Sequence, residues 1–161
     1  MKYEQDLRNA REHQRELEDF LKKVVKKKPK NLDDAFHSAH ESTFQRIDCL
    51  ECANCCKTTS PIFRDVDVKR ISKKLKCSTR EFEDEYLRRD EDGDLVLKSS
   101  PCTFLNNDNT CSIYDMRPQA CREYPHTDRK KVVQIMNLTK KNMLICPAVS
   151  QIVFHVKKDL F

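Results

Sequence analysis

Four cysteines lie within eight residues near the middle of the chain, and this cluster limits what the chain can fold around. The pattern is Cys49-x-x-Cys52-x-x-Cys55-Cys56. An x-x spacer folds two sulfurs to the same side of the backbone, so overlapping CxxC pairs bring several thiolates to one ion. Cysteine can also serve as a small buried apolar residue, but the polar residues between these four do not form a core pattern. The cluster therefore predicts a metal centre.

The chemistry of the thiols depends on the compartment. Residues 1–6 alternate in charge and contain no apolar region of a secretory signal. No segment approaches the roughly 18 apolar residues of a transmembrane helix. We therefore expect a cytoplasmic protein that does not bind membranes, and in that compartment dense cysteines bind metal more often than they pair as disulfides. The odd total of nine cysteines also fits a disulfide framework poorly.

Composition narrows the choice of function further. Hydrophobic residues make up 38% of the 161 residues and charged residues 35%, so the core is thin for the length and bound metal would help to hold the fold. The net charge of +5 is spread among many acidic residues, so nucleic acid is not an expected partner. Gly93 is the single glycine, which excludes the glycine-rich loops that bind nucleotide phosphates.

The apolar pattern predicts an α+β fold that is predominantly α, a small metal-stabilised domain with a short β-hairpin and a long N-terminal helix. Residues 1–30 form the helical segment and residues 31–161 the cysteine-cluster domain. Apolar residues recur at alternating three- and four-residue steps over residues 3–28, which predicts one helix with an apolar seam. The seam positions are Tyr3, Leu7, Ala10, Gln14, Leu17, Leu21 and Val24. This helix either docks on the domain or pairs with a second copy in a homodimer.

Other signals place the remaining elements. Asn31 can cap a second helix, which carries His37 and His40 on roughly one face; they could be metal ligands, but ordinary helix-surface positions are the favoured interpretation. Further helices are predicted over residues 65–76, over 78–87 with a capping box, from about 117, and over 147–160. A turn at 90–94 precedes a short strand at 95–97, and a hairpin is predicted across 104–114 with a cysteine near each end.

The other cysteines lie in motifs that can be compared with known families. These motifs are Pro101-Cys102-x-Phe104-Leu105, Cys111-Ser112-Ile113-Tyr114, Arg117-Pro118-x-x-Cys121-Arg122-x-Tyr124-Pro125 and Cys146-Pro147. With the first cluster they resemble the YkgJ-type cysteine-cluster family, described as a zinc- or iron-chelating domain, over about residues 45–155. The resemblance implies eight metal ligands, and Cys77 lies outside the pattern. The eight are Cys49, Cys52, Cys55, Cys56, Cys102, Cys111, Cys121 and Cys146.

Eight thiols can form two four-thiolate sites or one site with spare thiols. Side chains of adjacent residues diverge, so Cys55 and Cys56 could serve different ions. One partition places Cys49, Cys52, Cys55 and Cys146 on a cubane cluster, because three closely spaced cysteines and a remote Cys-Pro are typical of ferredoxins. Cys56, Cys102, Cys111 and Cys121 would hold a second ion. The cofactor is expected to be zinc or an iron–sulfur cluster, with 4Fe–4S the form expected if the metal is iron.

Thiolate sites carry negative charge that nearby cations should compensate. Lys57, Arg117 and Arg122 are placed in the motifs for this role.

Three functions fit these observations. The first is electron transfer through an iron–sulfur centre to an unidentified protein partner. The second is a structural zinc scaffold or interaction module. The third, protein-lysine methyl transfer, is implied by the resemblance of flagellin lysine N-methylases to this family in the cysteine-cluster region. No catalytic residue is assigned, because the candidate bases Glu51 and Glu123 do not match a zinc-hydrolase signature.

Overall fold

The apolar residues of the two ends of the chain form one core. The computed structural model describes residues 2–161. These residues divide into two units, one formed by residues 2–52 together with Pro125–Phe161 and the other by Ala53–Tyr124. The elements of the first unit are α1 (Glu4–Glu12), α2 (Gln14–Lys27), α3 (Leu32–Phe44), α4 (Cys49–Cys52), the 3₁₀ helix η2 (Val132–Ile135), α9 (Met136–Asn142) and α10 (Pro147–Leu160).

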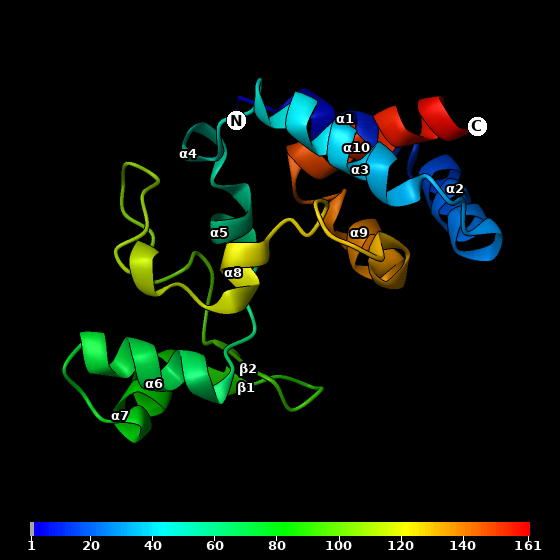
Figure 1. Ribbon diagram of the computed structural model, residues 1–161. Coiled ribbons are helices and arrows are strands. Elements are labelled where there is room, and N and C mark those ends of the chain that lie inside the picture. Colours follow the sequence, from blue (N-terminus) through cyan, green and yellow to red (C-terminus); the bar gives the residue numbers. More distant parts are fainter. Residues whose placement is uncertain (1) are drawn as a thin grey trace. The chain divides into compact units, whose positions relative to one another are not determined.

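Helix α10 is the centre of the first unit. It contacts α3 most extensively and also contacts α1, α2 and α9 (Figure 1). Phe36, Val149, Ile152 and Val153 are fully buried where these helices meet. Four seam residues of α1 and α2 belong to the same core, and Leu7 is also buried. The four are Ala10, Leu17, Leu21 and Val24. Of the two predicted roles for the seam, this burial supports docking within the chain.

The N-terminal segment is two consecutive helices, not the single helix predicted from the period. His13 breaks the helix with φ −103° and ψ 14°. Its ring packs edge-on against Phe154 of α10 at 5.6 Å between centroids, and its Nδ1 lies 3.0 Å from the Asn9 carbonyl oxygen. Both helices contact α10, so the seam is buried on each side of the break.

The second unit contains shorter elements around a smaller core. Its elements are α5 (Asn54–Thr58), α6 (Asp65–Lys74), α7 (Thr79–Tyr86), β1 (Leu87–Arg89), β2 (Leu95–Leu97), the 3₁₀ helix η1 (Tyr114–Met116) and α8 (Gln119–Glu123). The two strands pair antiparallel in the register Leu87↔Leu97 and Arg89↔Leu95. Phe82 is fully buried and stacks on Phe104 at 6.3 Å between ring centroids.

The fold class is confirmed, a mostly helical chain with one short antiparallel hairpin. The capping box of α7 is present, with Glu81 N–H donating to Ser78 Oγ at 3.1 Å. Asn31 stands at the start of α3, but its side chain makes no capping hydrogen bond. The hairpin predicted across 104–114 is a single antiparallel bridge, Leu105↔Cys111, around a tight turn. Among residues 2–161 no helix is long and apolar enough to cross a bilayer.

Candidate metal centre

Four of the eight predicted ligands act on one another electrostatically in the second unit. Cys56 is on α5, Cys121 on α8, and Cys102 and Cys111 on the irregular segment between β2 and η1. The charges of Cys56, Cys102 and Cys111 all act on Cys121. Burial, followed by these neighbours, raises the pKa of Cys121 to about 12. Soft thiols grouped in this way are the donor set that zinc and iron–sulfur clusters take.

The backbone around the two loop cysteines is arranged to donate to sulfur. Burial raises the pKa of Cys102, and the N–H groups of Phe104 and Leu105 act against this by hydrogen-bonding to the sulfur. The same holds for Cys111 and the N–H of Ile113. Such N–H groups stabilise a thiolate and orient it toward a metal ion. The segment is also tied to α5, because the N–H of Cys102 donates to the carbonyl oxygen of Cys56 at 2.8 Å.

Of the three cations predicted to compensate thiolate charge, Arg117 acts on three of these thiols. A hydrogen bond from the Cys55 thiol, aided by the charge of Arg117, lowers the pKa of Cys56 to about 7 against the effect of burial. Arg117 acts in the same direction on Cys111 and Cys121. Its guanidinium lies 3.8 Å from the centroid of the Tyr114 ring, which fixes its position.

A buried carboxylate connects α6 to the helix that carries Cys121. Asp67 is fully buried, and its Oδ1 accepts hydrogen bonds from Arg70 Nη2 at 2.7 Å and from Gln119 N–H at 3.2 Å. Arg70 also donates to the carbonyl oxygen of Arg117 at 2.8 Å. The contact from Asp67 ends at Gln119, the first residue of α8, and the contact from Arg70 ends at Arg117, just before that helix. Asp67 and Arg70 therefore position Arg117 and Cys121 through the backbone.

Three further predicted ligands lie in the first unit. Cys49 and Cys52 are the ends of α4, and Cys146 stands at the start of α10. The pKa of Cys146 is raised to about 11, first by burial and then by the charges of Cys49 and Cys52. Hydrogen bonds from the N–H groups of Val149 and Ala148 act in the opposite direction. A cysteine at a helix N-terminus receives hydrogen bonds from free N–H groups and so is suited to bind metal as the thiolate.

The short helix α4 is held by the N-terminus of α1. The Tyr3 hydroxyl donates to Glu51 Oε2 at 3.1 Å and accepts a hydrogen bond from the N–H of Asp48 at 3.2 Å. Lys2 forms an ion pair with the same carboxylate. Glu51, considered above as a catalytic base, therefore has a structural partner on α1 beside the first cysteine pair.

The remaining cysteines differ in their surroundings. Cys55 belongs to the second unit, where its thiol donates to Cys56; its place in the first set stays a prediction from the sequence. Cys77 packs against the second core, and its thiol lies 3.8 Å from the Ser72 carbonyl oxygen. Its exclusion from the ligand set stays a prediction. The assignment of the eight cysteines as ligands also stays a prediction.

Sequence reasoning included Asp67 and Arg70 in the family resemblance but gave no role to the residues that position the cysteines. Asp67 and Arg70 lie in the helix between the cysteine motifs, and an acid in the first turn followed by a base three residues later looks like an ordinary surface pair. Burial of Asp67 is a tertiary property that this local pattern does not contain. Tyr3 was assigned to the seam, whereas its hydroxyl binds α4.

Comparison with known families gives one match. The family model CxxCxxCC, "Putative zinc- or iron-chelating domain", matches residues 48–147. No curated protein is significantly similar to the chain. The same is true of solved structures.

Proposed function

Because this chain belongs to the CxxCxxCC family of zinc- or iron-chelating cysteine domains, we propose that it is a metalloprotein with two thiolate centres and that it transfers electrons. The observation that carries the proposal is the separation of the interacting thiols into two groups. Cys121 interacts with Cys56, Cys102 and Cys111, and Cys146 interacts with Cys49 and Cys52.

An iron–sulfur cluster is proposed for the group that contains Cys146. Three cysteines at x-x spacing and a remote Cys-Pro match the ligand spacing of ferredoxin clusters. The N–H groups of Ala148 and Val149 that act on Cys146 would stabilise a bound thiolate, and hydrogen bonds to sulfur are one of the factors that set a cluster's potential. A cluster bound here would supply a one-electron carrier. The electron partner would be another protein.

A structural zinc ion is the second candidate, and it suits the group around Cys121. The segment that carries Cys102 and Cys111 has one isolated bridge and one turn of 3₁₀ helix over residues 98–116. A four-thiolate zinc ion would join this segment to α5 and α8 and supply folding free energy directly. In this case the second unit would be a scaffold.

The test is metal and acid-labile sulfide analysis, with visible spectra, of protein purified without oxygen. The wild type is compared with Cys146→Ser and Cys121→Ser, one variant for each group. Electron transfer predicts iron with matching sulfide in the wild type, and loss of that iron and of visible absorbance in Cys146→Ser. Colourless protein that contains only zinc would exclude electron transfer and leave the scaffold. If either substitution removed all the metal, the two centres would not be separate.

A further inference from the structure

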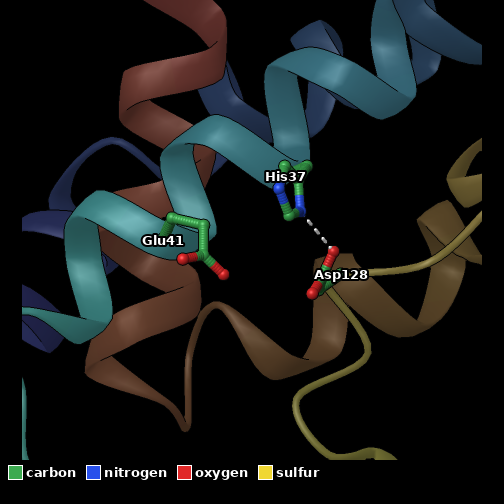
Figure 2. Close-up of side chains that lie close together, drawn as sticks. All are labelled: His37, Glu41 and Asp128. Atoms are coloured by element: carbon green, nitrogen blue, oxygen red, sulfur yellow. Dashed lines mark hydrogen bonds and ion pairs between the residues drawn. The ribbon is translucent and has the colours of Figure 1, made fainter.

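Three side chains outside the cysteine groups converge on one point of the first unit. His37 and Glu41 are one turn apart on α3, and Asp128 lies on the segment that leads to η2 (Figure 2). One ligand atom from each of the three lies within 4.8 Å of the others. His37 Nδ1 donates to Asp128 Oδ1 at 2.7 Å, and the Glu41 carboxylate extends from the same face of α3 as His37 (Figure 2).

We propose that His37, Glu41 and Asp128 form a nitrogen- and oxygen-ligated site for a divalent first-row transition ion. This site is separate in residues and in chemistry from the thiolate groups, and it does not depend on the proposed electron transfer.

The segment that carries Asp128 is fixed to α3 on both sides of the site. Before it, Thr127 is fully buried and its hydroxyl is hydrogen-bonded to His40 Nδ1 at 2.9 Å. After it, the carboxylate of Asp33 accepts hydrogen bonds from the N–H groups of Lys131 at 2.7 Å and Val132 at 2.9 Å. Asp128 is therefore held opposite the helix that supplies the other two ligands, which reduces the entropy lost when an ion binds.

The charges and the spacing suit a cation. Two carboxylates so close together repel each other, and a bound divalent ion would remove that repulsion. Metal bonds of about 2.0–2.2 Å to nitrogen and oxygen place the ligand atoms of one ion up to about 4.4 Å apart, and the three ligand atoms here lie within 4.8 Å of one another. All three side chains are exposed, so an ion in solution can reach them. Three protein ligands would leave positions for water or a solute.

The ligand types predict which ions bind. An imidazole nitrogen suits zinc, iron and nickel, whereas carboxylate oxygens alone suit magnesium, calcium and manganese. With one imidazole and two carboxylates, the site should accept Mn²⁺ and hold it in the presence of excess Mg²⁺. Thiolates are soft ligands and bind Mn²⁺ weakly, so this ion distinguishes the proposed site from the cysteine groups.

The experiment adds Mn²⁺ to the full chain, with its cysteine-bound metal retained as purified, and follows paramagnetic broadening of backbone amide signals by NMR. The proposal predicts broadening centred on residues 37–41 and 127–129 at substoichiometric Mn²⁺, unchanged by a tenfold excess of Mg²⁺. His37→Ala and Glu41→Gln should each weaken Mn²⁺ binding by about tenfold or more. Glu41→Gln leaves the His37–Asp128 hydrogen bond in place, so its effect would report lost ligation and not a loosened segment.

His155 and Asp159 provide the matched control. They form an exposed histidine–aspartate pair on α10, with Nε2 and Oδ2 3.5 Å apart. Within residues 2–161 no third potential ligand groups with them. His155→Ala should leave the broadening unchanged. The proposal is overturned if Mn²⁺ broadens both pairs equally, if Mg²⁺ displaces it, or if His37→Ala binds Mn²⁺ as the wild type does. Each of these results would mean general attraction of cations to surface acids.

Discussion

At the scale of single residues, Asp67 is the buried carboxylate that connects α6 to the helix that carries Cys121. Its carboxylate accepts hydrogen bonds from the N–H of Arg64, the guanidinium of Arg70 and the N–H of Gln119. In Asp67→Asn, one oxygen becomes an NH₂ group that faces these donors. We expect unfolding by denaturant to require about 2–3 kcal/mol less free energy, since hydrogen bonds to buried charged groups contribute about that much.

The control for this substitution is Asp65→Asn. Asp65 is exposed in the first turn of the same helix and loses the same charge. Its free energy of unfolding should stay within about 0.5 kcal/mol of the wild type. If the two substitutions lowered the free energy of unfolding equally, Asp67 would stabilise the protein through its charge at the helix start and not through the buried hydrogen bonds.

The same carboxylate predicts a pH dependence. Burial raises the pKa of Asp67, but the hydrogen bonds from Arg64, Arg70 and Gln119 outweigh it, so the pKa in the folded protein is lowered. A lowered folded pKa contributes stability above the unfolded value of about 3.9, and this contribution is lost as pH falls through the folded pKa. Melting temperatures of wild type and Asp67→Asn, measured in parallel from pH 7 to pH 2, should converge below about pH 4. A constant difference over this range would contradict the assignment.

At the scale of elements, α4 depends on a contact from α1. Tyr3→Phe removes the hydroxyl that joins Glu51 to the N–H of Asp48. Because this contact orients the helix that carries Cys49 and Cys52, its loss should speed metal removal from that group by a chelator by about tenfold, the lower end for lost outer-shell contacts. Tyr114→Phe is the control, since Tyr114 is exposed in the second unit. Equal rates for both variants and the wild type would show that α4 holds its shape without Tyr3.

Elements were predictable where their signals are local. The α7 helix follows from Ser78 and Glu81, because both partners of a capping box stand in the sequence. The break at His13 was not predictable, because the seam continues across it and its cause is the packing of the ring on Phe154. The pairing of His37 with Asp128 was not predictable for the same reason, because the two residues meet only when the segment before η2 folds back onto α3. Period and spacing describe one segment at a time and do not contain such contacts.

At the scale of the whole molecule, the two units differ in how much apolar burial supports them. The first core contains fifteen buried hydrophobic residues, and the second contains nine. The thin core expected from composition therefore describes the second unit better than the first. A bound ion would contribute a larger share of the second unit's stability, since metal binding adds directly to folding free energy.

Metal removal should therefore affect the two units unequally. After treatment with a strong chelator at neutral pH, amide hydrogen exchange is expected to increase most over residues 98–121, which carry Cys102, Cys111 and Cys121. Amides of α3 and α10 should stay protected, because their hydrogen bonds are covered by a core of fifteen buried hydrophobic residues, and the predicted ligand Cys146 only packs against it. Restoring the metal should reverse the change. If α3 and α10 lost protection to the same extent as residues 98–121, the units would unfold together and the cysteine-bound metal would stabilise the chain as one cooperative structure.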